Sequence, residues 1–398
     1  MIANALIGLI LLPTALAGSG ADGTTNALVT SLGNDVVAVE TYTRSSEKLV
    51  GDILLRVPGT TRFHYELTFA NDGSVRRSVF EVKPIGAPTV DDQRRLTLEF
   101  DKDQVRIVSN IGGEQQMATK PSAGARQVLF MGGYGASFGL YSSFGMYEHL
   151  FAQLKDLTNE ARPVMAFSAA TAEPAQRFVR KVSPTEFDVD FFKMAWSRVT
   201  LDESGRVVSA DATGTTEKTT TKRVDALDIA KMEKEFVALD KSGKGMGSAS
   251  PNVETKAKVG GASVTVRYGS PRLRGRTGVM AAMSASGKVW RTGANEAATI
   301  EVDRDITIGG TSIPKGRYSL FTLPTAGGVQ LIVNKETGQW GLAYKEAQDL
   351  ARIPMTVSQS AAPMESFTIS IAPNGPATEL RMAWDTFVWS VPIAAAVK

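Results

Sequence analysis

Alternating apolar and polar positions run through the first half of the chain and predict antiparallel strands. Residues 63–69 show the two-residue period of a half-buried strand, with Phe63 and Tyr65 on the apolar side and His64 on the polar side. Asn71-Asp72-Gly73 follows, and Asn and Gly tolerate the positive φ of a tight turn, so residues 75–82 are expected to return as a hairpin. The same pattern predicts hairpins from 96–100 with 105–108 and from 196–201 with 206–210, and a strand over 187–191.

Two segments have the helical period instead. Apolar residues recur three or four positions apart from Phe144 to Leu157, which gives one apolar stripe, and a weaker stripe runs from Leu227 to Leu239. These patterns predict that residues 30–241 form a mainly β domain, an antiparallel curved sheet with one or two helices.

A change of composition then separates two parts of the chain. Residues 242–258 are rich in Gly, Ser and Lys and contain almost nothing apolar, which is typical of a domain linker. From Ala262 onward, short alternating segments are separated by turns such as Gly309-Gly310 and Gly327-Gly328. This spacing predicts a β-sandwich or jelly-roll-like domain over residues 259–398.

Composition excludes several classes of function. Net charge is +3 among 398 residues, so the sequence gives no argument for nucleic-acid binding. Because Cys is absent, there is no disulfide, no thiolate nucleophile and no cysteine zinc site, and the 2 histidines cannot build a three-histidine metal site. We expect no metal site and no cofactor.

The first residues have the form of a secretory signal. Residues 7–12 are apolar except for Gly8, Pro13 follows, and Ala15-Leu16-Ala17 has the small-x-small form of a cleavage site, although no Lys or Arg precedes the apolar run. We expect residues 1–17 to be a signal peptide and the protein to be periplasmic or secreted. No other segment approaches the roughly 20 apolar residues that a membrane span requires.

A basic run is the first candidate for binding chemistry. Arg272, Arg274 and Arg276 would project from one face of an extended segment, about 7 Å apart. Guanidiniums so placed repel unless an anion lies among them, which could be a carboxylate or phosphate ligand or the side chains of Glu296 and Asp349. The alternative is a solvated edge or an internal salt-bridge network.

A second candidate is the segment 290–296. Trp290, Arg291, Asn295 and Glu296 combine an aromatic ring, a guanidinium, an amide and a carboxylate on a loop that contains a glycine, which suits a sugar or another polar ligand. A structural loop that pins itself through its Asn would have the same composition. A hydrolytic carboxylate pair could come from Glu296, Asp349 or Glu365, but glycoside cleavage requires a separation of about 5 to 9 Å that sequence does not give.

The glycine-rich segment 132–139 matches neither the dinucleotide-binding nor the P-loop pattern. We interpret it as a flexible, aromatic-rich loop that leads into the helix at 142–157 and could cover an apolar groove. His149 on that helix is expected to be packed or at the surface, and His64 to be exposed.

A series of short motifs runs in a fixed order through the C-terminal part. They are Tyr268 with Pro271, Arg274-Gly275-Arg276, 289–296, Ile308-Gly309-Gly310, 316–321 with Pro324, Asn334, Trp340-Gly341, Asp349 with Arg352, and Trp384 with Pro392. Through these motifs residues 262–393 resemble the bacterial exported domain-of-unknown-function family twenty-nine-eleven, although Ser270 stands where the family usually has an arginine and a tryptophan common near position 329 is missing. The resemblance implies an exported β-rich domain and no established activity.

The N-terminal pattern is similar, as a fold only, to periplasmic lipoprotein and lipid carriers.

These observations favour a non-enzymatic binding protein for a small polar or anionic ligand, for example an envelope glycan. Arginines would supply charge, Trp290 a stacking surface, and Asn295 and Glu296 directional hydrogen bonds. Two alternatives stay open, a carrier of an apolar ligand through the N-terminal domain and a carboxylate-dependent hydrolase. The expected ligand-binding residues are Arg274, Arg276, Trp290, Arg291, Asn295, Glu296, Asp349 and Arg352.

Overall fold

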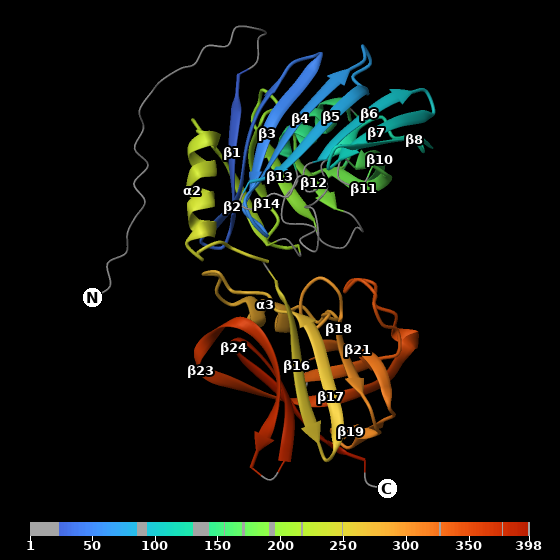
Figure 1. The fold of residues 1–398 in the computed structure, drawn as a ribbon, viewed down its shortest axis with the longest axis vertical. Helices are drawn as coiled ribbons and strands as arrows, with labels where there is room; N and C mark the ends of the chain where they lie inside the picture. The colour runs from blue at the N-terminus through green and yellow to red at the C-terminus, as the bar shows by residue number, and fades with distance from the viewer. Residues whose placement is uncertain are drawn as a thin grey trace, which may run out of the picture.

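Two large β-sheets, one from each half of the chain, build the protein (Figure 1). The computed structural model describes residues 24–85, 94–129, 143–154, 156–168, 172–190, 196–215, 218–248, 250–325, 328–375 and 377–396. The expected signal peptide and the glycine-rich segment 132–139 lie outside these residues. The predicted fold class, mainly β with an N-terminal antiparallel sheet and a C-terminal β domain, is confirmed.

In the described residues, fifteen strands form the N-terminal sheet, in the order β8-β7-β6-β5-β4-β3-β2-β1-β15-β14-β13-β12-β11-β10-β9. Neighbouring strands are antiparallel except β9 and β10, which are parallel. The predicted hairpins are present as β4–β5, β6–β7 and β13–β14. The strands are β1 (Asn26–Leu32), β2 (Asp35–Arg44), β3 (Lys48–Leu55), β4 (Thr61–Phe69), β5 (Val75–Pro84), β6 (Arg94–Asp101), β7 (Gln104–Ile111), β8 (Glu114–Pro121), β9 (Val128–Leu129), β10 (Arg162–Ser168), β11 (Pro174–Lys181), β12 (Glu186–Asp190), β13 (Ser197–Leu201), β14 (Val207–Asp211) and β15 (Thr219–Val224).

Helix α1 (Phe144–Gln153) lies inside the curve of this sheet. It contacts β2 and β3 as well as β9 and β14, strands far apart in the sheet order, so the sheet must curl around it. Tyr147 stacks on Phe151 at 5.9 Å between ring centroids, and Phe151 stacks on Phe187 of the sheet at 4.4 Å. Helix α2 (Ile229–Lys241) covers the opposite face, where its buried Ile229 and Phe236 pack on side chains of β2 and β3 (Figure 1).

The C-terminal sheet has, in the described residues, the order β16-β17-β18-β21-β22-β23-β24-β19-β20. Its two long strands, β23 and β24, fold back over β16 and β17: Thr255 Oγ1 donates to Ile369 O at 2.7 Å, and Tyr268 meets Phe367 edge to face at 5.6 Å. The apolar sides of these layers enclose the second core. The elements are β16 (Asn252–Val259), β17 (Ala262–Gly269), α3 (Val279–Ala285), β18 (Ala298–Val302), β19 (Ile306–Ile308), β20 (Thr311–Ile313), β21 (Gly316–Thr325), β22 (Gly328–Asn334), the 3-10 helix η2 (Glu346–Gln348), β23 (Asp349–Asn374) and β24 (Ala377–Ala395).

The prediction of a linker over residues 242–258 is wrong for the second half of this segment. Strand β16 begins at Asn252 and pairs with β17 along its whole length. Its side chains alternate between exposed and half-buried because it is an edge strand, and the charged residues typical of such an edge gave it a linker-like composition. The first half of the segment packs on the N-terminal domain. Met246 is buried beside Val37 and Val57, and Lys244 O accepts a hydrogen bond from Arg56 Nη2 at 3.1 Å.

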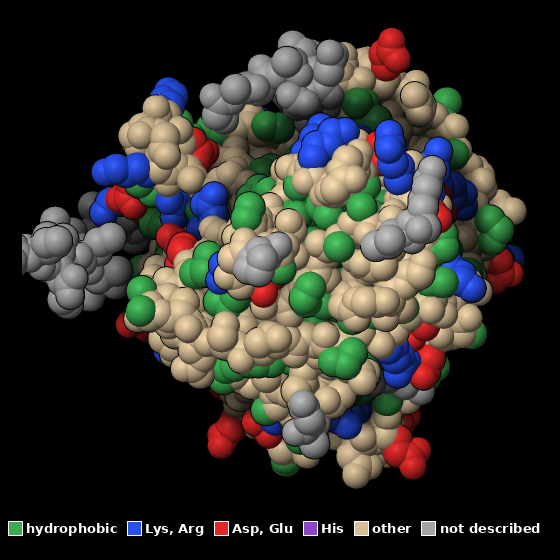
Figure 2. Space-filling model, turned by 90° about the horizontal axis from the view of Figure 1, so that it is seen from below, with side chains coloured by type: hydrophobic (Ala, Val, Ile, Leu, Met, Phe, Trp, Pro, Cys, Tyr) green, Lys and Arg blue, Asp and Glu red, His purple; other side chains and the backbone are tan. Residues whose placement is uncertain are grey.

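The end of the C-terminal domain that faces away from the N-terminal domain shows no concentrated charge (Figure 2). Basic and acidic side chains are scattered around the rim of this face, and apolar side chains are spread thinly among polar ones. None of the helices in the described ranges has the length and apolar content to cross a bilayer.

Candidate functional site

The first predicted site residue, Arg274, links the two domains. Its Nη1 forms an ion pair with Asp35 Oδ2 at 3.0 Å, its Nη2 donates to Met246 O at 3.2 Å, and its own carbonyl accepts a hydrogen bond from Asn34 N at 2.9 Å. Because φ is +50° at Arg274 and +77° at Gly275, the chain turns here and the arginines at 272, 274 and 276 do not share an extended face. Gly275 lies so close to the Asn34 side chain that a Cβ at this position would overlap it.

Arg276 points back toward its own loop. Its Nε donates to Leu273 O at 2.8 Å and its Nη2 to Arg272 O. Burial, and to a lesser extent the positive charge of Arg274, lower the pKa of Arg276. Glu365 partly offsets this shift, since its negative charge favours the charged guanidinium.

Arg291 is a buried cation without an acidic partner in the described part of the chain. It is 8% exposed, its Nη1 reaches Asn295 O only at 3.5 Å, and its Nε is buried with no hydrogen-bond partner. Burial lowers the pKa of Arg291 to about 10. Gly341 packs directly on the Arg291 side chain, where a Cβ would overlap both that side chain and Asn295 O.

Lys218, which the sequence pattern did not single out, completes a cluster of positive charge. It lies between β14 and β15 of the N-terminal sheet and donates to Thr213 O at 2.9 Å. Its pKa is lowered first by burial and then by the charges of Arg276 and Arg291. An ammonium loses its proton more readily than a guanidinium, so Lys218 is the member of this group whose proton is most easily lost. We call Lys218, Arg276 and Arg291 the cation cluster; both domains contribute to it.

A loop over residues 335–348 lies against the segment 290–296. Gly341 N donates to Asn295 O at 3.0 Å, and Trp340 forms a backbone bridge with Glu296. The Arg291 guanidinium lies 5.8 Å from the centre of the Trp340 ring, within cation–π range. Gln339 Nε2 is a second buried donor without a partner. Trp340-Gly341 belongs to the motifs of the family resemblance, so a signal for this loop was present in the sequence.

Asp349 and Arg352 hold the base of that loop. Asp349 is therefore not the carboxylate among Arg272, Arg274 and Arg276 that the sequence suggested. Asp349 accepts hydrogen bonds from Asn334 Nδ2 at 2.9 Å and Tyr344 Oη at 2.7 Å and pairs with Arg352 Nε at 2.9 Å. Burial first, and then Asp349, raise the pKa of Tyr344 to about 12. Each member of this network already has protein partners, so we assign it a positioning role.

Trp290 does not offer a free stacking surface. Its ring stacks on Trp384 at 6.4 Å and meets Phe367 and Trp389 edge to face at 5.0 and 6.1 Å. It is therefore part of the C-terminal core. Glu296 is exposed and bridges Trp340 through its backbone.

The carboxylates considered for hydrolysis have different surroundings. Glu365 Oε1 accepts a hydrogen bond from Arg274 N at 3.0 Å, while both oxygens of Asp349 are engaged at the base of the loop 335–348. Glu365 and Asp349 are thus engaged in contacts that hold the fold. An acid–base pair requires two carboxyl groups that face the same substrate bond. The described residues also contain no group of three His, Asp or Glu side chains that could hold a metal ion.

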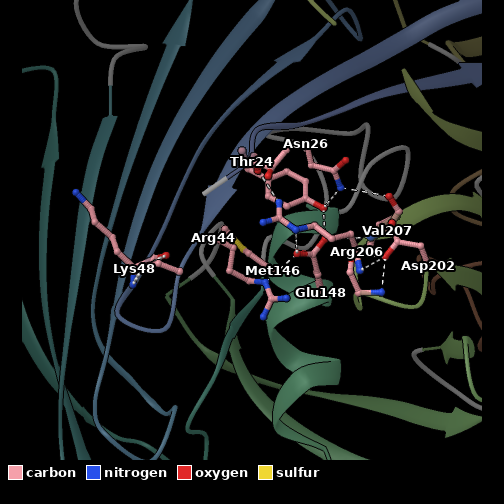
Figure 3. Close-up of polar contacts among 12 residues, drawn as sticks. Thr24, Asn26, Arg44, Lys48, Met146, Glu148, Asp202, Arg206 and Val207 are labelled. Atoms are coloured by element: carbon pink, nitrogen blue, oxygen red, sulfur yellow. Dashed lines mark hydrogen bonds and ion pairs between the residues drawn. The ribbon is translucent and has the colours of Figure 1, made fainter. Parts of the chain in front are cut away.

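A buried polar network holds α1 inside the N-terminal sheet (Figure 3). Glu148 on α1 is 0% exposed and accepts hydrogen bonds from Tyr42 Oη at 2.6 Å, Val207 N at 3.0 Å and Arg44 Nε at 2.8 Å. Figure 3 shows Arg44 and Arg206 on either side of this carboxylate, the latter at 4.0 Å.

The start of α1 is held by a second buried carboxylate. Glu40 accepts hydrogen bonds from Ser143 Oγ at 2.7 Å and Phe144 N at 2.9 Å, and from Tyr65 Oη at 2.7 Å. Both Glu40 and Glu148 are 0% exposed, so the helix is tied to the sheet by buried carboxyl groups.

Comparison with known proteins bears on the C-terminal part. Residues 250–393 match the family "Protein of unknown function (DUF2911)". The resemblance to family twenty-nine-eleven is thereby confirmed, and the cation cluster takes Arg276 and Arg291 from this DUF2911 domain. Curated proteins gave no match. The crystal structure of a DUF1089 family protein (PA1994) from Pseudomonas aeruginosa is 14% identical over 44% of this chain and 90% of that chain, with a TM-score of 0.33, which is too low to carry an argument.

Proposed function

We propose that this protein binds a small anionic ligand, without transforming it, at the contact between its two domains. The observation that carries the proposal is the cation cluster: Arg291 is 8% exposed and unpaired among the described residues, and Arg276 and Lys218 lie near enough to interact with one another's charge or with Arg291. A carboxylate or phosphate would supply the missing acceptor.

Energetics support this assignment over a purely structural one. A buried charge without a partner destabilises a fold by several kcal/mol, and ion pairs elsewhere in this chain show that carboxylates are available for structural arginines. Arg274 has Asp35, and Arg352 has Asp349. At this site Arg291 Nε and Gln339 Nε2 are buried donors without a partner, so a ligand that meets them must present acceptors.

Thermal unfolding of the full chain with inorganic phosphate, at constant ionic strength, tests the proposal. Phosphate at about 100 times its Kd should stabilise the wild type by about 2.7 kcal/mol. R291M should lose this response and, without phosphate, should unfold at the same temperature or higher, because methionine keeps the apolar stem and removes the unpaired charge.

R304M provides the matched control, since Arg304 is an exposed cation in the turn between β18 and β19. It should keep the full phosphate response. A wild type indifferent to phosphate, or equal responses in R291M and R304M, would refute the proposed site. A large loss of stability in R291M would show that Arg291 serves the fold.

We also propose that the protein is exported to the periplasm or cell surface. In that compartment an envelope glycan that carries acidic groups would be a suitable anionic ligand. The apolar run at residues 7–12 and the small residues Ala15 and Ala17 support export. Mass spectrometry of the protein from its native host should show that the first 17 residues of the sequence have been removed. Recovery of the intact chain from the cytoplasm would contradict export.

A further inference from the structure

Trp340 combines exposure with a fixed position. It is 38% exposed, among the largest exposed apolar side chains in the described residues. Its backbone is nevertheless tied to Glu296 by a bridge, and Ala343 N donates to Trp340 O at 2.8 Å. Because the backbone that carries the exposed ring is fixed, less conformational entropy is lost when a ligand stacks on it.

The loop that carries Trp340 is built to keep that ring beside Arg291. Asn334 Nδ2 donates to Lys345 O at 3.0 Å, and Lys335 N donates to Gln348 O at 2.8 Å, so the two ends of the loop are joined at its base. Gly341, next to Trp340, leaves no space between the loop and Arg291. The guanidinium of Arg291 and the exposed ring of Trp340 therefore lie side by side, 5.8 Å apart.

We propose that the anion recognised here carries a ring, a sugar or an aromatic group, that stacks on Trp340 while its charged group meets Arg291. This inference rests on the proposed anion site and names its ligand class. Trp and Tyr rings bind the flat faces of such groups, and the neighbouring guanidinium orients the acidic substituent. Trp340 thus takes the stacking role that the sequence suggested for Trp290.

Isothermal titration of the full chain with three probes tests the ligand class. The probes are inorganic phosphate, phenyl phosphate and glucose 6-phosphate. At least one ring-bearing probe should bind ten or more times more tightly than phosphate. W340A should reduce that preference to less than threefold and change the Kd of phosphate itself by no more than about threefold, since the weak cation–π contact to Arg291 is also lost.

The conservative variant W340F keeps a flat ring in the same loop and should retain part of the preference, which separates stacking from collapse of the loop. If the wild type binds all three probes with equal affinity, the proposal that the ligand carries a ring is refuted, while the proposed anion site is retained. Absence of phosphate binding overturns the anion site itself. A ring preference that survives in W340A also refutes the role of Trp340.

Discussion

Replacement of Glu148 by alanine is expected to destabilise helix α1 by about 3 to 5 kcal/mol, the range for removing one partner of a buried ion pair. Glu148 is 0% exposed and receives Tyr42 Oη, Arg44 Nε and Val207 N. The substitution leaves the buried Tyr42 Oη and Val207 N without this acceptor, which costs more than the lost bonds themselves.

Hydrogen exchange measured by mass spectrometry would locate the effect. A loss of 3 to 5 kcal/mol corresponds to exchange faster by roughly two to four powers of ten, at about 1.36 kcal/mol per tenfold. The acceleration should appear in α1 and in the strands that contact it. E160A, which removes an exposed carboxylate just beyond the helix, is the control and should leave exchange unchanged. Exchange of α1 within threefold of the wild type in E148A would show that hydrophobic packing alone holds the helix.

The sequence predicted strands best where one face is buried. In β4, side chains alternate between buried and half-buried from Arg62 to Phe69, and this local pattern is visible in the amino-acid sequence. Strand β16 was not predicted, because its Lys and Glu side chains point to solvent at the edge of the sheet. It is a strand because it pairs with β17, and the residues of β16 alone do not predict this pairing.

The candidate site was only partly predictable, because its partners are distant in the chain. Arg274 was expected to bind a ligand, yet its acidic partner Asp35 lies 239 positions away, on the other domain. Trp290 was expected to stack on a ligand, but its ring packs on Trp384 and Phe367, which lie in strands that follow much later in the chain. Lys218 carried no local signal, since a lysine in a turn is ordinary. Only the three-dimensional contact of the two domains brings it near Arg276 and Arg291.

Acidification should destabilise the protein through His149. This side chain is 4% exposed, stacks on Phe69 at 3.6 Å between ring centroids, and donates from Nε2 to Gly73 O at 3.0 Å. Burial lowers the pKa of His149 from 6.5 to about 4. Because the unfolded chain binds the proton at the higher pKa, stability is complete above about pH 6.5 and falls as the pH drops toward 4. At pH 4 this one group should cost about 3 kcal/mol.

H149Q, in which the amide can still donate to Gly73 O, should remove that cost. Urea unfolding of the full chain at pH 7 and pH 4 should show a smaller loss in H149Q than in the wild type, by about 3 kcal/mol. Other carboxylates titrate in both proteins and cancel in the comparison, and Asp202, with its pKa lowered to about 2, titrates mainly below this window.

His64 gives a control of opposite sign. The hydrogen bond to Asp52 at 3.3 Å raises the pKa of His64, so its contribution to stability is fully present below its unfolded pKa and is lost as the pH rises through the folded one. H64Q should therefore lose more stability than the wild type on acidification, where H149Q loses less. If the two variants shift in the same direction, or if H149Q follows the wild type down to pH 4, His149 is not the buried neutral group that its contacts indicate.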